Sequence, residues 1–512
     1  MIVIPYSSSR SKRALPLRSC FSCHARKVKC DRQKPCTPCR SRGVPSNCEY
    51  ANTAQEHVTR EPGDTVERLR EKCKKLEQEL AELKSTCRSA RSTRTISTSD
   101  HGSDQNEISL PPSLPSTDAV LDNLVQRLLD RYSPRNDRGQ MQFTVLQQVA
   151  SLTCTSPLIR EALHATSLLT LGRFESNKRI ESAGYVRYNN AIRLLGRSLL
   201  QLDEQCSLEA LAATYLFGVI EMSSSSPSVL FKHATWALHL LQHRSPLRHQ
   251  TGLGKALFLE VRIYWVTFAI LRRRHTFLAT EEWLTIPWGT DEKPKDLLQE
   301  LLDIASRIPS FLAESDYTVS MINEHCLSPI EMQSVQEKLH IKETRIFRQL
   351  MRWEGTLDAM PGGISESPTP YRDDFPILQY HDPNMGIAFA THYEYSNVLL
   401  ANAMCYYWAL LLTISEPTPI SLGSLESHER YVVACKICRS IRYFVRTAPG
   451  SLIYRLLLPM LLAYNVFAPG SVEATYLEDV SHFIQRHFGT SLFRTLMNAD
   501  SGVDYRQLSK LF

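Results

Sequence analysis

The sequence predicts a mainly α-helical protein that joins a small cysteine-rich unit and a short coiled coil to a large all-helical C-terminal domain. Six of its 14 cysteines fall within residues 20–48. Apolar residues recur at heptad spacing over residues 66–87. From residue 118 onward they return on one helical face in segment after segment, whereas strand-like alternation is scarce. A chain of 512 residues is long enough for two or three such domains.

The positive charge of the chain is concentrated at its N-terminus. The net charge is +6, but residues 1–50 hold 11 Lys and Arg against two acidic residues, which gives +9 there and −3 over the rest. This distribution predicts that residues 1–50 bind a polyanion and that the rest of the chain does not. We interpret residues 1–19 as a basic disordered tail in front of the cysteines.

The spacing of the six cysteines points to metal binding. They follow the pattern C-x2-C-x6-C-x5-C-x2-C-x8-C, in which each half is a CxxC followed by a later cysteine. The opening "MIVIPY" does not resemble a signal peptide, so we expect reduced thiols rather than disulfides. A closed zinc site uses four thiolates, and six can serve two zinc ions only if two sulfurs are shared. A zinc ribbon or finger with separate sets of four ligands is the alternative.

Segment 20–48 resembles the fungal Zn₂Cys₆ binuclear-cluster DNA-binding domain, both in its cysteine spacing and in its intervening basic residues. The resemblance implies two zinc ions per chain. It also implies that Cys20 and Cys36 are bridging thiolates, that Cys23 and Cys30 complete one site, and that Cys39 and Cys48 complete the other.

The same resemblance implies which basic residues meet double-stranded DNA. The segment "HARKVKC" after the first CxxC corresponds to the helix that enters the major groove, and Arg26 and Lys27 match the two residues that read base edges. Such cations can donate to guanine O6 and N7, so a CGG-type triplet is the expected target. Lys29, Arg40 and Arg42 are expected near phosphates, where they fix the register.

Residues 65–87 are predicted to form a coiled coil that makes the protein a homodimer. The apolar seam consists of Val66, Leu69, Cys73, Leu76, Leu80 and Leu83. In a parallel dimer Lys72 would face Glu77 of the partner, and Glu79 would face Lys84. The alternative is an amphipathic helix that docks on the large domain.

The rest of the chain divides by composition. Residues 20–50 form the cluster domain, 51–64 a linker, 88–116 a disordered Ser/Thr/Pro-rich linker, and 117–512 a helical regulatory domain. Helical periodicity is found in 186–202, 206–222, 256–274, 295–312, 334–352, 386–414, 427–447 and 451–466. The uncharged run 398–414 is short for a bilayer span, so we expect a buried helix and no membrane partner.

These features predict a nuclear, zinc-dependent, sequence-specific regulator of RNA polymerase II genes, which works with the transcription machinery rather than as an enzyme. Segments such as "HATWALHLL" resemble the helical regulatory region of fungal cluster regulators, some of which control secondary-metabolite genes. Two alternatives stay open: an enzyme or ligand-sensing domain fused to a DNA-binding head, and an interaction protein that binds zinc but no DNA. "CKIC" at Cys435–Cys438 and the pair His239 and His243 have metal-like spacing, but ordinary packing explains them better.

Overall fold

In the computed structural model the chain forms two compact units, residues 1–111 and 112–512. The described residues are 20, 23, 28–31, 33, 35–42, 48, 117–132, 144–200, 207–223, 237–289, 295–324, 328–357, 363–368, 374–382, 384–417, 424–448, 450 and 452–497. The predicted tail, both linkers and the coiled coil lie outside these residues.

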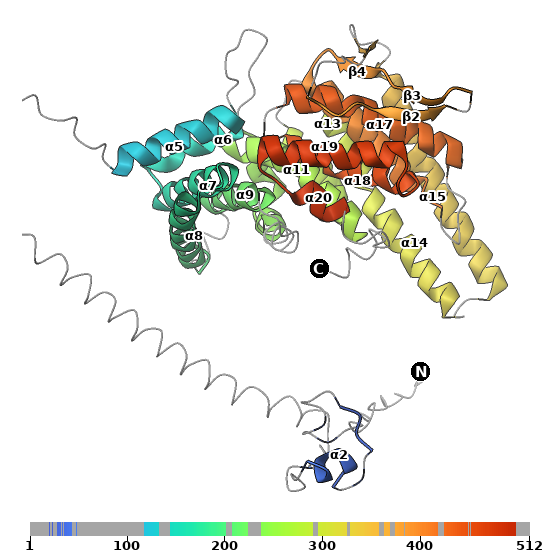
Figure 1. Cartoon of the computed structure of the whole chain (residues 1–512), viewed down its shortest axis with the longest axis horizontal. Coiled ribbons are helices and arrows are strands. Elements are labelled where there is room, and N and C mark those ends of the chain that lie inside the picture. The colour runs from blue at the N-terminus through green and yellow to red at the C-terminus, as the bar shows by residue number, and fades with distance from the viewer. Residues whose placement is uncertain are drawn as a thin grey trace, which may run out of the picture. The chain divides into compact units, whose positions relative to one another are not determined.

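The larger unit is built mainly of helices, which confirms the predicted fold class (Figure 1). Its α-helices are α5 (Thr117–Tyr132), α6 (Val145–Ala150), α7 (Pro157–Phe174), α8 (Lys178–Ser198), α9 (Leu208–Met222), α11 (Gly252–Arg272), α12 (Glu281–Thr285), α13 (Leu297–Ala305), α14 (Ile308–Asn323), α15 (Pro329–Gly355), α16 (Val398–Ile414), α17 (Ser427–Thr447), α18 (Leu457–Val466), α19 (Val472–Phe488) and α20 (Leu492–Met497). Short 3₁₀ helices span Ser151–Cys154, Pro246–His249, Phe277–Ala279, Ile286–Trp288 and Ile453–Leu456.

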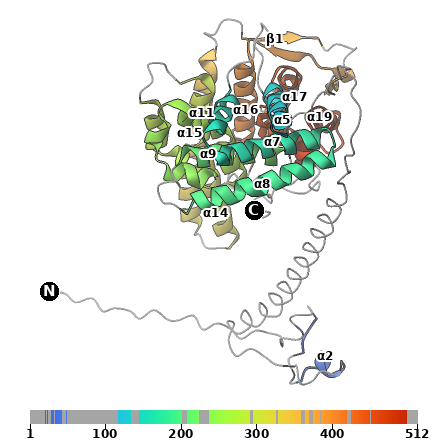
Figure 2. The same ribbon diagram turned by 90° about the vertical axis from the view of Figure 1, so that its left-hand side faces the viewer.

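The centre of this unit is the apolar helix α16 (Figure 2). Every residue from Leu400 to Ile414 is buried. Helices α13, α15, α17 and α18 pack around it, because a helix that is apolar on all sides must be covered on all sides. The expected buried helix at 398–414 is confirmed. Among the described helices, none is long and apolar enough to cross a membrane.

Polar side chains define where several helices begin. Asn397 accepts a hydrogen bond from the backbone N–H of Leu400 at 2.9 Å and starts α16. Ser328 and Glu331 form a capping box at the start of α15, in which each side chain binds the backbone N–H of the other residue. These caps satisfy N–H groups that have no partner within the helix.

At one end of the unit, α7 is largely buried and α8 covers it from outside (Figures 1 and 2). A Cβ at Gly184 of α8 would lie 2.7 Å from Cγ of Leu169, so only glycine allows the two helices to approach this closely. The outer face of α8 stays exposed.

Two predicted helical segments are wrong in their limits. Four short strands, β1 (Ile364–Ser367), β2 (Gln379–Asp382), β3 (Gly386–Phe389) and β4 (His392–Tyr395), form two antiparallel pairs, β1 with β4 and β2 with β3. The predicted helix 386–414 therefore begins only at Val398. The predicted helix 295–312 is divided into α13 and α14, with Pro309 in the first turn of α14, where its missing N–H costs nothing.

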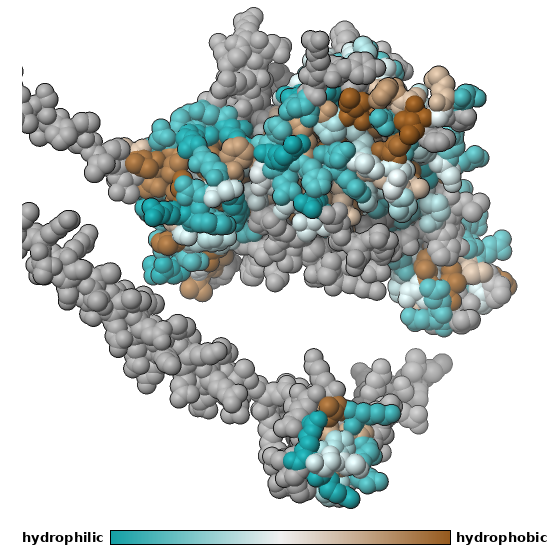
Figure 3. Space-filling model, viewed as in Figure 1, coloured by the Kyte–Doolittle hydropathy of each residue, from teal (hydrophilic) through white to brown (hydrophobic). Residues whose placement is uncertain are grey.

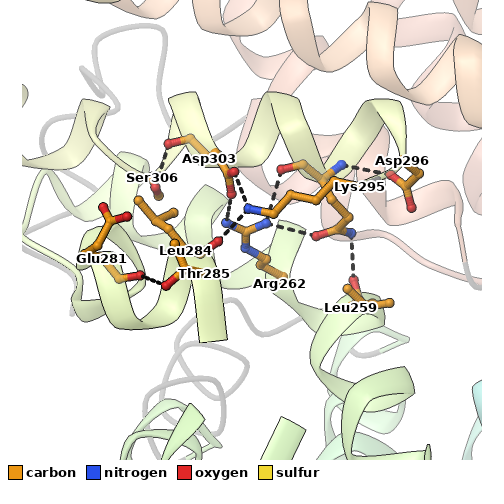
Figure 4. A network of polar contacts seen from close by, with 10 residues as sticks. Leu259, Arg262, Glu281, Leu284, Thr285, Lys295, Asp296, Asp303 and Ser306 are labelled. Atoms are coloured by element: carbon orange, nitrogen blue, oxygen red, sulfur yellow. Dashed lines mark hydrogen bonds and ion pairs between the residues drawn. The ribbon is translucent and has the colours of Figure 1, made fainter. Parts of the chain in front are cut away.

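A buried charged network connects α11 to α13 (Figure 4). Arg262 has no exposed surface, and its guanidinium donates to Asp303 at 2.6 Å and to the backbone and side-chain oxygens of Gln299 at 3.2 and 3.0 Å. Lys295 contacts the second oxygen of Asp303 at 2.5 Å. The network neutralises charge that would otherwise be costly to bury.

Apolar side chains also reach the surface (Figure 3). Met385, Ile387 and Phe389, around β3, have exposed fractions of 74%, 57% and 55%. Ile330 and Tyr317, on the neighbouring helices α15 and α14, are also largely exposed.

Candidate metal centre

A four-residue helix positions two of the six cysteines. Helix α2 (Thr37–Arg40) begins after Cys36, and the backbone N–H groups of Cys39 and Arg40 both donate to the carbonyl of Cys36. Residues three apart lie on one face of a helix, so Cys36 and Cys39 present their sulfurs together.

An acidic side chain holds the loop in front of this helix. Asp31 accepts hydrogen bonds from the backbone N–H groups of Thr37 at 2.9 Å and Gln33 at 3.3 Å. Hydrogen bonding to Thr37 lowers the pKa of the Asp31 carboxyl, so the carboxylate form is favoured. The sequence motif did not single out Asp31, although it is the one acidic residue between Cys20 and Cys48.

The sulfur atoms are spaced as ligands of a tetrahedral metal site. The Sγ–Sγ distances are 3.7 Å for Cys20–Cys36, 3.7 Å for Cys20–Cys39 and 3.5 Å for Cys23–Cys36. Two thiolates bound to one zinc ion at about 2.3 Å in a tetrahedron lie about 3.8 Å apart. The ligand atoms of these four cysteines all lie within 4.8 Å of one another.

The last two cysteines also lie at this cluster. Cys30 belongs to a second group of close ligand atoms, with Asp31 and again Cys36. The Cys48 sulfur accepts a hydrogen bond from the backbone N–H of Cys36 at 3.1 Å. Cys30 is half-buried and the other five cysteines are buried. Cys36 is thus common to both groups.

The donor set fits a cation. Burial raises the pKa of Cys20, Cys23 and Cys36 to about 12, because clustered thiolates would lose their hydration. A bound zinc ion reverses this preference and holds the thiolate form. All six cysteines are free of disulfides. Sulfur ligands at tetrahedral spacing favour zinc over the hard cations that prefer oxygen.

The predicted DNA-contacting residues are only partly described. Lys29, Arg40 and Arg42 are exposed, and Arg40 donates to the carbonyl of Pro35 at 3.3 Å. Arg26 and Lys27 lie outside the described residues. So does the predicted dimer seam, which consists of Val66, Leu69, Cys73, Leu76, Leu80 and Leu83.

The two residue pairs of the larger unit that have metal-like spacing do not form a metal site. Cys435 and Cys438 lie in α17, and His239 and His243 lie in the helical residues 237–243. Among the described residues, the groups of three or more potential metal ligands all lie within the N-terminal cysteine cluster. Burial raises the pKa of the Cys435 thiol to about 11, as expected for a packed cysteine.

The geometry therefore defines the class of the site as a thiolate-rich candidate metal centre, in which Cys36 belongs to two groups of close ligand atoms. Comparison with known proteins gives its family: residues 18–57 match the Fungal Zn(2)-Cys(6) binuclear cluster domain. This segment belongs to that family, and the domain binds two zinc ions, which confirms the resemblance found in the sequence.

Individual relatives match over short stretches. The uncharacterized protein AN5342 of Emericella nidulans is 29% identical over 123 residues, which cover 24% of this chain and 26% of that protein. The pyrrolocin cluster transcription factor fsdR of a fungal species (strain NRRL 50135) is 45% identical over 64 residues, 11% of this chain and 8% of that protein.

The Zn(2)-C6 fungal-type transcription factor pigI of Monascus ruber is 37% identical over 87 residues, 16% of this chain and 10% of that protein. The matched stretches thus span about a quarter or less of each of these three relatives. No solved structure matches the chain.

Proposed function

We propose that this protein is a zinc-dependent, sequence-specific DNA-binding regulator of transcription. The observation that carries the proposal is the cysteine cluster, in which six thiols at the family's spacing converge beside exposed cations. The names of the relatives fsdR and pigI, both transcription factors, support it. A nuclear protein that acts on RNA polymerase II genes follows from this role.

In the proposed site, two zinc ions share Cys20 and Cys36. Cys23 and Cys30 complete one tetrahedron, and Cys39 and Cys48 complete the other. Bound zinc supplies the cross-link that a segment of about thirty residues needs, since so short a chain buries too little apolar surface to fold alone.

Sequence recognition is assigned to Arg26 and Lys27, which would donate to guanines of a CGG-type triplet. Lys29 and Arg40 would contact phosphates. One cluster reads only a short site, so residues 65–87 are proposed to join two chains and to double the recognised sequence. The name of fsdR, a pyrrolocin cluster transcription factor, supports a secondary-metabolite gene cluster as the regulated target.

The test compares two single variants of the full-length zinc-loaded protein. Lys27→Ala should weaken binding to the preferred site by about 1–3 kcal/mol and relax the preference at the triplet. Arg40→Ala should weaken binding to all sequences alike and reduce the dependence on salt concentration, because it removes a phosphate contact. Both effects can be measured by fluorescence anisotropy on preferred and scrambled duplexes at several salt concentrations.

Equal losses on preferred and scrambled DNA for Lys27→Ala would contradict the assignment of base reading. A wild-type protein that binds two zinc ions but does not distinguish the two duplexes would contradict the proposed function itself. In that case a zinc-binding interaction protein would be the better description.

A further inference from the structure

Helix α17 and the short strands of the larger unit form the walls of a cleft. Strand β4 packs against this helix (Figure 1). The cleft has a volume of about 390 Å³. That volume lies within the range of sites for small organic molecules, and a ligand with two fused rings fits within it.

Aromatic side chains from the strands and one face of the helix line this β–α17 cleft. Its walls include Tyr380, Phe389 and Tyr393 from the strands and Val432, Lys436 and Arg439 from α17. The three helix residues have the spacing i, i+4, i+7, which places them along one helical face. The cleft thus combines an aromatic wall with a wall that carries two cations.

Arg439 is fully engaged by its neighbours in the walls. Its Nη2 lies 2.6 Å from a carboxylate oxygen of Glu366, its Nε donates to the carbonyl of Thr391 at 3.0 Å, and its Nη1 donates to the Tyr393 hydroxyl at 2.9 Å. Hydrogen bonds from Thr391 and Arg439 lower the pKa of the Glu366 carboxyl, so Glu366 stays charged. The charges of Arg439 and Glu366 therefore compensate each other.

Two donors in the walls have no acceptor among the described residues. The Tyr393 hydroxyl accepts from Arg439, but it donates its own proton to none of these residues, although Tyr393 is buried. The ammonium of Lys436, a half-buried residue, forms no ion pair with any of them. Glu473 is buried and accepts a hydrogen bond from the Tyr431 hydroxyl at 2.6 Å. Lys436 therefore gives the cleft a positive charge that no described residue pairs with.

Apolar surface beside the cleft is left uncovered. Phe389 and Val432 line the cleft and have exposed fractions of 55% and 39%. Ile387, two residues before Phe389 in β3, is also largely exposed. Exposed apolar patches of this kind mark binding sites, because covering them removes apolar surface from water. A flat apolar ligand in the cleft would bury part of Phe389 and Val432.

We propose that the β–α17 cleft binds a small planar aromatic molecule that carries one carboxylate. Phe389 and Tyr380 would cover its rings. The Lys436 ammonium would pair with the carboxylate, and the Tyr393 O–H would donate to it. A neutral ring would leave Lys436 without a partner, and an aliphatic acid would cover the aromatic walls less well. This binding stands independently of the proposed recognition of DNA.

The test uses the full-length zinc-loaded protein and 2-naphthoate, followed by isothermal titration calorimetry. Wild type should bind one 2-naphthoate per chain in a saturable titration. 2-Naphthamide has nearly the same shape but no charge, so it should bind about tenfold more weakly. Octanoate, a carboxylate without a ring, should also bind more weakly than 2-naphthoate. Absence of saturable 2-naphthoate binding, or equal affinity for either comparison ligand, would overturn the proposal.

Lys436→Met removes the charge and keeps a side chain of similar length. Affinity for 2-naphthoate should fall about tenfold, the usual effect of losing a charged hydrogen bond, whereas affinity for 2-naphthamide should stay unchanged. The matched control is Lys338→Met, at an exposed position of α15 outside this cleft, which should bind both ligands as wild type does. An equal loss for both ligands in Lys436→Met, or no loss for 2-naphthoate, would refute the pairing with a carboxylate.

Val432→Trp places a large side chain in the cleft and should abolish saturable binding of both ligands. Its matched control is Val186→Trp, at an exposed position of α8 outside the cleft, which should bind them as wild type does. Ala390→Leu, which narrows the cleft from the strand side, serves as a second blocking variant if Val432→Trp does not fold. Undiminished 2-naphthoate binding by a blocking variant whose circular dichroism matches wild type would refute the site.

Discussion

Cys36 differs from the other cysteines of the cluster in belonging to both groups of close ligand atoms. Its backbone also takes part, since its N–H donates to the Cys48 sulfur and its carbonyl accepts from two residues of α2. A residue with these contacts connects the two halves of the cysteine pattern.

Replacement of Cys36 should therefore lower the number of bound zinc ions per chain more than replacement of a cysteine at the edge of the cluster. Cys36→Ser leaves three thiolates at each of the two proposed sites. The protein recovered after gel filtration should therefore contain no zinc. Cys30→Ser should retain about one zinc per chain, and Cys154→Ser, an exposed cysteine of the larger unit, should retain two. Metal content can be measured by inductively coupled plasma mass spectrometry. Equal zinc content in Cys36→Ser and Cys30→Ser would contradict a shared sulfur.

His249 offers a second test at the residue scale. It is fully buried, its Nδ1–H donates to the carbonyl of Gly254 at 2.9 Å, and its Nε2 has no hydrogen bond among the described residues. The rings of Phe258 and Trp283 lie 5.7 Å from its own. Burial lowers its pKa to about 4, because a proton on Nε2 would place a charge in this apolar surrounding.

The larger unit should therefore lose stability as the pH falls from 6.5 towards 4. Over this range the unfolded chain binds the proton and the folded protein does not, so protonation favours unfolding. Because the pKa of histidine in the unfolded chain is near 6.5, the free energy of unfolding should fall by about 2 kcal/mol between pH 7 and pH 5. Urea unfolding of wild type and His249→Phe at both pH values measures it. His249→Phe should lack this pH-dependent loss of unfolding free energy, whereas the control His482→Phe, at an exposed position, should keep it. An equal loss of unfolding free energy between pH 7 and pH 5 in wild type and His249→Phe would contradict the assignment.

At the scale of elements, the sequence predicts the positions of helices better than their ends. The apolar period that marks α16 continues upstream through aromatic residues, so it does not separate β3 and β4 from the helix. The signal that could have found the boundary is Asn397, a typical N-cap three residues before the buried run. In the same way Pro309 indicates a new helix start between α13 and α14. The strands are only four residues long, and β1 pairs with β4 rather than with the next strand in the chain, so a local pattern does not reveal them.

The predicted coiled coil is an element that can be tested directly. Leu76 is the central d position of residues 65–87, so Leu76→Glu would place two carboxylates in the seam of a dimer. Burying them is costly, and a coil of about three heptads has little stability to lose. The full-length variant should sediment as a monomer and still bind two zinc ions. It should also lose the preference for paired triplets at a fixed spacing.

The control for this experiment is Gln78→Glu, which adds the same charge at an outward position of the heptad, leaves the apolar seam intact and should keep the dimer. If wild type itself sediments as a monomer at tens of micromolar and binds paired sites no better than single ones, residues 65–87 do not dimerise. The docked-helix alternative would then be preferred.

At the scale of the whole molecule, the chain consists of two compact units that are stabilised in different ways. The N-terminal unit contains the small cysteine cluster, which we expect to be stabilised by metal, whereas the larger unit has an extensive apolar core that includes α16. The cysteine spacing predicted metal binding in the first unit, and the resemblance to a known family predicted a binuclear cluster there.

Removal of zinc should therefore affect one unit and spare the other. Chelation with a strong zinc chelator should abolish DNA binding, because the short cysteine segment cannot fold without metal. The midpoint of thermal unfolding of the helices, followed by circular dichroism, should stay unchanged. DNA binding should return on addition of zinc but not of magnesium, which prefers oxygen ligands. A large shift in the helical unfolding midpoint would contradict the independence of the two units.

The position of α16 in the chain has a consequence for synthesis. Helices α13 and α15 are made before the helix that covers their apolar faces, since α16 begins only at Val398. At about 5–20 residues per second, roughly 15 to 60 s pass between the start of α5 and the end of α16. During that time the growing chain carries apolar faces that have not yet found their partner. We therefore expect the yield of folded protein to depend on chaperones that protect these faces on the ribosome.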